Sequence, residues 1–471
     1  MTQKSAIEKI WESHRIAPLG ESNDLLLIDR ILLHERTGGV AMQSLEDSGR
    51  VIRHPSHVFV TMDHVVDTIP GRSDTTQMPT GKDFITVTRD TALRAGVTLF
   101  DLGDPRQGIG HVISPEMAIV LPGATLVCPD SHTCTQGAFG ALAWGIGSSE
   151  GEHALATSTL RVQRPRIMRI TIEGEPGVGV TAKDIALHIV SELSSAGAKG
   201  FAIEYAGPVI RAMSMESRMT LCNMATELSA FTAFIAPDET TFEFLKDRAY
   251  APKGEEWVRA VNEWRKIKSD PEAIYDEDIV INATDIAPTI SWGTSPQQSC
   301  PINKRIPLFN EVSHRDTQES YQRALTYMGL TPGGRLSGLR IDAAFIGSCT
   351  NSRLPDLRRA AAILKGRRVA KGVNAICVPG SSAVKAAAEA EGLDLIFKAA
   401  GFEWRESGCS MCFFAGGESF GPKQRVVSST NRNFESRQGP QTRTHIASPE
   451  TVAASAISGC ITDPRRLGAR T

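Results

Sequence analysis

The sequence predicts an α/β protein whose sheets are built mainly from parallel strands. Short apolar runs rich in β-branched residues recur along the chain, polar loops follow them, and helix-like segments follow the loops. Glycine is abundant, with 41 residues, and it clusters in these loops. Strands and helices in this alternation are typical of parallel sheets covered by helices.

The first expected elements lie in the N-terminal half. "ATLVC" (124–128) predicts a buried strand, which we expect to lead through the polar turn "PDSHTCTQ" into a small-residue helix over "GAFGALAWGIG" (137–147). "TAKDIALHIVSELSSAG" (181–197) predicts a helix with Thr181 as its N-cap. "FAIEYAGPVI" (201–210) predicts a further strand.

The C-terminal part repeats the alternation. We expect strands over "IDAAFIG" (341–347), "VNAICV" (373–378) and "RVVSST" (425–430), and helices over "DLRRAAAILKG" (356–366) and "AVKAAAEAEGL" (383–393). Ligands of parallel sheets bind beyond the carboxyl ends of the strands. The polar loops of this sequence fall at those ends.

The length of 471 residues exceeds what one core usually holds and favours roughly three domains. We place them at 1–170, with His/Asp loops, at 171–285, and at 286–471, with the cysteine motifs. Residues 250–305 are richer in Lys, Pro and charge, so we expect them to run over the surface.

The composition bears on partners and location. The 51 Lys and Arg against 53 Asp and Glu leave a net charge of −2, which offers no electrostatic footprint for nucleic acid. No apolar stretch approaches the ~18 residues of a membrane span. The polar N-terminus lacks the apolar region of a signal peptide. The nine cysteines are spread along the chain, so we expect a reducing, cytoplasmic location.

Three cysteines stand out by position. Cys409 and Cys412 form a C-x-x-C pair, which suits half a zinc site, a redox dithiol, part of an iron–sulfur site or two buried apolar residues. Cys349 follows an expected strand, and it is either a third thiolate ligand or a small buried residue. The remaining six are expected to be structural: Cys128, Cys134, Cys222, Cys300, Cys377 and Cys460.

A polar set lies on comparable loops. "TMDHVV" supplies Asp63 and His64, "GIGHVI" supplies His111, and "PDSHT" supplies Asp130 and His132. A nearby carboxylate orients an imidazole for general acid catalysis. Each histidine alone is more often a hydrogen-bonded structural residue, but five such groups on strand-end loops favour a catalytic set.

The segment "STNRNFESRQG" supplies Asn431, Arg432, Asn433 and Arg437. Arginine suits carboxylates because its guanidinium donates two parallel hydrogen bonds. Two arginines in one loop therefore indicate a di- or tricarboxylate substrate, although a solvated loop also explains them.

These segments together resemble the aconitase superfamily, and most closely its family of isopropylmalate dehydratase large subunits. The resemblance covers nearly the whole chain, because motifs such as "TMDH", "PDSHTCTQGAFGALAWGIGSSEGEHALAT", "GSCTNSR" and "NRNFESRQG" occur in that family's order. It implies three α/β/α domains of the aconitase iron–sulfur type, without the swivelling fourth domain.

The resemblance also implies one [4Fe–4S] cluster per subunit, held by Cys349, Cys409 and Cys412. Three thiolates for four irons leave one iron open to act as a Lewis acid on the substrate. It implies that Asp63 and His64 protonate the leaving hydroxyl. His111, Asp130 and His132 would position bound water and substrate.

Two further motifs carry family roles. In "CNMATE", Asn223 and Glu227 match positions beside the cluster and its bound water. In the C-terminal loop, Asn431, Arg432 and Arg437 match residues that contact the cluster and the substrate carboxylates.

The implied reaction is a dehydration and rehydration that interconverts 2- and 3-isopropylmalate in leucine biosynthesis. The family's proton-abstracting serine and a further arginine lie on the swivelling domain, which has no counterpart here. The resemblance therefore implies a small partner subunit that supplies the base, and no base is assigned within this chain.

The sequence departs from the family pattern at three points. Cys412 is followed by "FFAGGES" where the family reads roughly C-L-A-M-N, and "PDSHT" and "FESRQG" replace "GDSHT" and "FEGRQG". The first departure leaves open a paralogue acting on another 2-alkylmalate, such as citramalate (with citraconate as its product) or dimethylmalate. A zinc dehydratase and a non-catalytic RNA-binding apo-protein are further alternatives.

Overall fold

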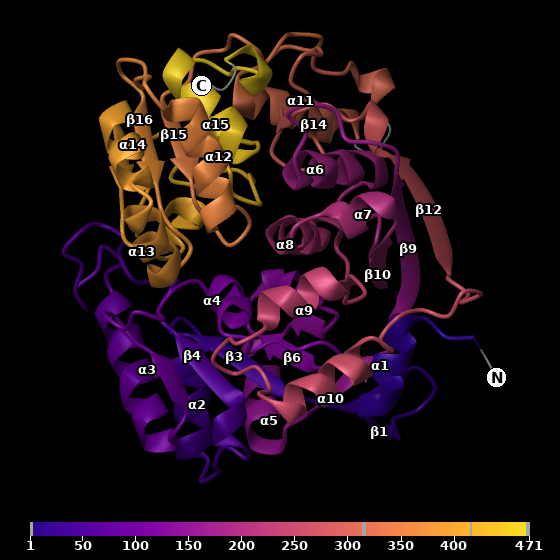
Figure 1. The fold of residues 1–471 in the computed structure, drawn as a ribbon. Coiled ribbons are helices and arrows are strands. Elements are labelled where there is room, and N and C mark those ends of the chain that lie inside the picture. The colour runs from indigo at the N-terminus through magenta and orange to yellow at the C-terminus, as the bar shows by residue number, and fades with distance from the viewer. Residues whose placement is uncertain (1–2, 313–316, 415–416, 468–471) are drawn as a thin grey trace. The chain divides into compact units, whose positions relative to one another are not determined.

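A computed structural model describes residues 3–312, 317–414 and 417–467. The chain forms two compact units, each assembled from segments far apart in sequence (Figure 1). Unit 1 comprises residues 1–63, 82–174 and 198–281, and unit 2 comprises residues 64–81, 175–197 and 282–471. The α/β class is confirmed, while the domain boundaries near 170 and 285 stay a prediction.

The largest sheet of unit 1 has five parallel strands in the order β5-β4-β3-β6-β7. The strand expected at 124–128 is its β6. The strands are β3 (Arg30–His34), β4 (Val58–Thr61), β5 (Thr98–Phe100), β6 (Thr125–Cys128) and β7 (Leu142–Gly145).

The helix expected over 137–147 is wrong. Residues Ser131–Phe139 form a run of 3-10 helix (η2), Gly140 ends it with φ 75°, and Leu142–Gly145 pairs with β6 as strand β7. Small residues such as these suit either conformation, so the free edge of β6 decided the outcome. The helices that accompany this sheet are α2 (Gly38–Asp47), α3 (Gly81–Ala95), α4 (Gly110–Glu116) and α5 (Ser148–Thr157).

Two smaller sheets complete unit 1. One is antiparallel and has the order β1-β2-β8, and the other has the order β11-β10-β9-β12. The strand expected at 201–210 is β10 over its first six residues, whereas its last three residues begin helix α7. The elements are β1 (Arg15–Pro18), β2 (Asn23–Leu27), β8 (Thr159–Gln163), β9 (Arg166–Glu173), β10 (Phe201–Ala206), β11 (Thr232–Phe234) and β12 (Glu277–Asn282), with helices α1 (Ala6–His14), α7 (Pro208–Ala212), α8 (Met215–Met224), η3 (Ala225–Leu228), α9 (Glu239–Leu245) and α10 (Glu255–Trp264).

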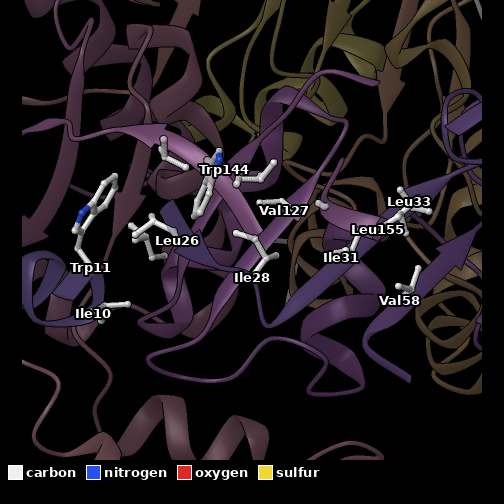
Figure 2. Close-up of a cluster of buried hydrophobic side chains, with 14 of the residues drawn as sticks. Ile10, Trp11, Leu26, Ile28, Ile31, Leu33, Val58, Val127, Trp144 and Leu155 are labelled. Atoms are coloured by element: carbon white, nitrogen blue, oxygen red, sulfur yellow. The ribbon is translucent and has the colours of Figure 1, made fainter. Parts of the chain in front are cut away.

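One apolar core joins these sheets (Figure 2). Trp11 of α1 and Leu26 of β2 belong to the same buried cluster as Val127 of β6 and Trp144 of β7. Burying side chains of this size stabilises a fold by about 1.5–3 kcal/mol each. The core therefore holds the strands whose ends carry the polar residues of unit 1.

Unit 2 contains a second five-stranded parallel sheet, with the order β17-β16-β15-β18-β19. Three of its strands confirm the runs predicted at 341–347, 373–378 and 425–430. The strands are β15 (Ala343–Ile346), β16 (Asn374–Cys377), β17 (Phe402–Trp404), β18 (Arg425–Ser428) and β19 (Arg443–Ile446).

The helices of unit 2 also follow the sequence pattern. The helices predicted at 356–366 and 383–393 are α12 and α13, and Thr181 caps α6 as expected, in a capping box with Asp184. The helices of unit 2 are α6 (Ala182–Leu193), α11 (Gln318–Met328), α12 (Leu354–Leu364), α13 (Ser382–Ala390), α14 (Leu393–Ala400) and α15 (Pro449–Ser458). Unit 2 also contains a two-stranded antiparallel sheet of β13 (Thr289–Ser291) and β14 (Ser299–Pro301). Among the helices described in either unit, none combines the length and the apolar character that a bilayer crossing needs.

Candidate active site

The predicted histidines of unit 1 meet around two carboxylates. Asp130 Oδ1 lies 3.4 Å from both His111 Nε2 and His132 Nδ1. The other ring nitrogen of His132, Nε2, lies 3.1 Å from Glu227 Oε1. Both histidines and Glu227 are buried. Carboxylates on both sides of His132 fix the orientation of its ring, which suits it to proton transfer.

Local structure explains this geometry. Asp130 follows strand β6 and caps η2, accepting a hydrogen bond from the backbone N–H of His132 at 2.7 Å. His111 is the second residue of α4, and Gln136 Nε2 lies 3.4 Å from its Nδ1. The end of one strand and the start of one helix therefore place the two imidazoles on the same carboxylate.

Asp63 is fixed by backbone and by a second acid. Its Oδ2 accepts the N–H of Gly110 at 2.9 Å, and its own N–H donates to Glu35 Oε2 at 3.0 Å. Glu35 is fully buried, and no local sequence pattern marks it as a site residue. These bonds hold the Asp63 carboxylate against the backbone of the residue that precedes His111.

Asn223 braces the same loop. Its Nδ2 donates to Thr135 Oγ1 at 2.9 Å, and that hydroxyl donates to the carbonyl of His132 at 2.6 Å. Asn223 and Glu227 both come from the α8–η3 segment. Unit 1 thus brings together Asp63, His111, Asp130, His132, Asn223 and Glu227, all predicted from motifs up to 164 residues apart in numbering (227 − 63).

The three predicted cysteine ligands lie in unit 2 and are all buried. Cys349 follows strand β15, and Cys409 and Cys412 belong to one tight turn in which the Cys412 N–H donates to the Cys409 carbonyl at 3.0 Å. Thiols on the loop after a strand and on a compact turn can converge on a metal group.

Asn431 and Ser348 connect the two cysteine segments. Asn431 Nδ2 lies 3.5 Å from Cys349 Sγ, and its Oδ1 lies 3.8 Å from Cys412 Sγ. Ser348 Oγ lies 3.3 Å from Cys412 Sγ and 3.9 Å from Cys349 Sγ. Cys349 and Cys412 therefore share two polar neighbours.

Two other predicted residues contact the sulfurs. His64 Nδ1 lies 4.0 Å from Cys409 Sγ, and Arg437 Nη2 lies 3.9 Å from Cys412 Sγ. The guanidinium of Arg437 lies 4.9 Å from the ring centroid of Phe413 and 5.1 Å from that of Phe434. Its Nε is buried without a hydrogen-bond partner among the residues that the structure describes.

The donor set fits an iron–sulfur cluster. Three buried thiols supply soft ligands, and nitrogen donors of Asn431 and Arg437 lie near two of the sulfurs. Such hydrogen bonds to sulfur stabilise clusters and tune their potentials. The unpartnered Nε of Arg437 is consistent with an acceptor that binds here, since a buried donor is costly to leave unpaired.

The other two polar residues of the C-terminal loop differ in their surroundings. Arg432 is partly buried. Asn433 is buried and donates from Nδ2 to Ser291 Oγ at 3.0 Å and to the Gly293 carbonyl at 2.7 Å. Asn433 therefore anchors the loop.

Sequence reasoning missed two buried cations beside this group. Lys183 Nζ donates to the carbonyls of Ser429 and Thr430 at 2.9 and 2.7 Å, directly before Asn431. Arg353 Nη2 donates to the carbonyl of Cys349 at 2.6 Å. Nothing local marked Lys183, which stands in an ordinary helix start, whereas Arg353 lies in the selected "GSCTNSR" motif.

Comparison with known proteins assigns the family. The model of the aconitase family (aconitate hydratase) matches residues 8–459. The chain belongs to the aconitase family. This membership confirms the predicted hydro-lyase class, and members of the aconitase family generally bind a [4Fe–4S] cluster, in line with the buried cysteines.

Two known proteins that are similar to this chain are a curated sequence and a solved structure. The 3-isopropylmalate dehydratase large subunit 1 of Bradyrhizobium diazoefficiens is 48% identical over 464 residues, which cover 98% of this chain and 97% of that protein. The solved holo-form of Thermococcus kodakaraensis aconitase X covers 91% of this chain and 89% of its own, with 12% identity and a TM-score of 0.47.

Proposed function

We propose that this chain is the large subunit of an iron–sulfur hydro-lyase that interconverts 2- and 3-isopropylmalate in leucine biosynthesis. The observation that carries the proposal is the 48% identity to a 3-isopropylmalate dehydratase large subunit over 98% of the chain. Relatedness at this level over nearly the full length favours the same reaction class and a closely similar substrate.

Cys349, Cys409 and Cys412 would hold one [4Fe–4S] cluster. When bound, the cluster supplies an open iron that polarises the substrate's hydroxyl and carboxylate as a Lewis acid. Support comes from the burial of the three thiols and from the Asn431 amide beside two of them.

The histidines and carboxylates would handle protons and water. Asp63 and His64 would protonate the leaving hydroxyl, whereas His111, Asp130 and His132 would orient water and substrate, with Glu227 holding His132 Nε2. A positioned general acid, the role proposed for Asp63 and His64, contributes about 10²–10⁴-fold to a rate. The supporting observation is that His132 faces a carboxylate oxygen on each side.

The substrate carboxylates would be bound by the C-terminal loop. Arg437 presents an Nε without a hydrogen-bond partner among the described residues, and its guanidinium lies near two aromatic rings. Asn431 and Arg432 would complete the contact with the cluster and the substrate. A guanidinium positioned by neighbouring rings suits two-point binding of a carboxylate.

A small subunit would complete the enzyme. Dehydration needs a base that removes a proton from carbon, and we assign no such base within this chain. The related protein is named a large subunit, which supports a partner that supplies the base.

Anaerobic reconstitution tests the proposal. The full chain, loaded with iron and sulfide and mixed with a small subunit of the same enzyme family, should convert isopropylmalate and lose its brown absorbance in air or chelator. Metal analysis separates this from a zinc dehydratase, because three thiols and an imidazole also suit zinc. Active protein that carries zinc and no iron would reject the cluster.

Salt-dependent RNA binding by the apo chain, without hydratase activity in the presence of the partner, would support the binding-protein alternative.

A second candidate is a hydro-lyase for another 2-alkylmalate. It is favoured by Phe413, which directly follows Cys412 in the stretch that departs from the family and whose ring lies 4.9 Å from the Arg437 guanidinium. Ala415 and Gly416 of the same stretch lie outside the described residues. Parallel assays with isopropylmalate, citramalate and dimethylmalate distinguish the candidates.

A further inference from the structure

A buried glutamate, Glu418, accepts hydrogen bonds from a loop distant in sequence. Its Oε1 accepts the backbone N–H of Thr68 at 2.9 Å, and its Oε2 accepts the Thr68 hydroxyl at 2.7 Å. The residue is only 3% exposed. A carboxylate this deeply buried is costly unless it is well partnered, so these bonds constrain Thr68 strongly.

The same carboxylate contacts the cysteine turn. Glu418 Oε2 also accepts the hydroxyl of Ser410, which stands between Cys409 and Cys412. Ser410 has φ 48°, in the left-handed region that few side chains adopt without cost. The Thr68 hydroxyl oxygen also lies 2.9 Å from Ser410 Oγ, so the three residues form one polar group in which both hydroxyls face the Glu418 carboxylate.

Arg405 balances the charge of this group. Its Nη1 lies 3.3 Å from Glu418 Oε1, as an ion pair rather than an aligned hydrogen bond, since this nitrogen has no such bond among the described residues. Both partners are buried. Arg405 also pairs with Glu403 at 2.8 Å, so it keeps a partner if Glu418 is removed, whereas removing Arg405 takes this cation from the buried Glu418 carboxylate.

Thr68 belongs to the loop of unit 2 that begins at His64. Two further contacts join this loop to the cysteine segment: the Glu406 N–H donates to the Thr68 carbonyl at 2.8 Å, and Arg72 donates to the Ser407 carbonyl. At the start of the loop, His64 Nδ1 lies 4.0 Å from Cys409 Sγ.

We propose that Glu418 is a positioning residue, which holds the loop carrying His64 against the turn carrying Cys409 and Cys412. The inference rests on the proposed function only for the role of His64 as a proton donor. Glu418 lies near the end of the "FFAGGES" stretch, where the sequence leaves the family pattern, and the proposal assigns a structural role to that residue.

Hydrogen exchange of the full chain, with and without the reconstituted cluster, tests the link directly. In Glu418→Ala the amide of Thr68 loses its acceptor, and we expect it to exchange at least about 10-fold faster. Glu418→Gln keeps an oxygen that can accept this N–H, so its effect should be smaller. Glu391→Ala, which removes an exposed glutamate of the same unit, is the matched control and should change nothing at Thr68.

Kinetics of the assembled enzyme supply the second readout. We expect Glu418→Ala to lower kcat by about 10–100-fold, as loss of a supporting hydrogen bond does at metal sites, with KM changing less. Thr68→Val should reproduce part of the loss, and the double variant should be no worse than Glu418→Ala.

Two results would overturn the proposal: unchanged exchange at Thr68 in Glu418→Ala, or fully additive losses in the double variant. If Glu418→Ala does not fold, Glu418→Gln and Thr68→Val carry both measurements. Should the wild-type complex turn over no alkylmalate, the proposed function fails, whereas the exchange result still decides whether Glu418 holds the loop.

Discussion

The side-chain amide nitrogen of Asn431 lies 3.5 Å from the sulfur of Cys349, although 82 residues separate the two in sequence. The oxygen of the same amide lies 3.8 Å from the sulfur of Cys412. Asn431 therefore relates the loop after β15 to the C-x-x-C turn, which is the arrangement on which the proposed cluster site depends.

Replacing a proposed ligand should remove the cluster. In Cys349→Ser we expect loss of most bound iron and of the visible absorbance, because serine is a poor ligand for the soft iron of a cluster. Iron and sulfide analysis of anaerobically purified protein measures this. Cys460→Ser, which changes a partly buried cysteine outside the site, is the control. Full iron content in Cys349→Ser would contradict the ligand assignment.

Replacing His132 should slow the reaction and spare the fold. His132→Gln removes a ring held by Asp130 and Glu227, and we expect kcat to fall by about 10²–10⁴. The cluster absorbance and the melting temperature should stay close to those of the wild type. His153→Gln, an exposed histidine of the same unit, provides the comparison. A rate equal to that of the wild type would show that His132 is only structural.

Lys183 should matter for the cluster, although it lies on a distant helix. Lys183→Met leaves the carbonyls of Ser429 and Thr430 without this donor, and each buried group left unpaired costs about 1–3 kcal/mol. We expect lower stability and faster loss of iron to a chelator. Lys365→Met, at an exposed lysine of unit 2, should match the wild type on both counts. Equal chelation rates in the two variants would reject the role of Lys183.

The stability of unit 2 should depend on pH through His445. Its Nε2 lies 2.8 Å from Arg425 Nη1 and therefore accepts, so Nδ1 carries the proton and donates to the Ser291 carbonyl at 2.7 Å. Burial, aided by Arg425, lowers the pKa of His445 to about 3 from 6.5. Unfolded protein therefore binds the extra proton between these values, and stability is lost as the pH falls from 6.5 toward 3.

The expected slope is about 1.4 kcal/mol per pH unit over that range. Denaturant unfolding at a series of pH values measures it. In His445→Asn the amide can still donate to Ser291, so the variant should be less stable near neutrality yet lose less stability on acidification. A variant with the wild-type pH slope would show that another group is responsible.

Phe413 should influence substrate choice. Its ring lies 4.9 Å from the guanidinium of Arg437, which we propose binds a substrate carboxylate. Phe413→Leu therefore alters the packing beside the substrate-binding residue. A single methylene gained or lost in an apolar pocket already shifts specificity by roughly 10–200-fold. We expect the ratio of kcat/KM for isopropylmalate and citramalate to change within this range. Phe397→Leu, a core substitution in the same unit, controls for general loss of packing. An unchanged ratio would place Phe413 outside the specificity-determining residues.

Much of the fold was predictable from local sequence. The apolar β-branched runs at 341–347 and 373–378 became β15 and β16, and Thr181 capped its helix as its residue type predicts. The segment 137–147 was not predictable, because small residues fit a helix or a strand. Pairing with β6, a nonlocal contact, made part of it strand β7.

The candidate site also has a part that local sequence predicts and a part that depends on nonlocal contacts. From residue type, spacing and order, the sequence predicts which residues carry the chemistry: three cysteines, three histidines and their carboxylates. The long-range contacts around them depend on the tertiary fold, such as Lys183 beside Ser429, 246 residues away, and Thr68 beside Glu418, 350 residues away. The physical reason is that motifs and periodicity act over a few residues, whereas a buried hydrogen bond depends on where the completed fold brings donor and acceptor together.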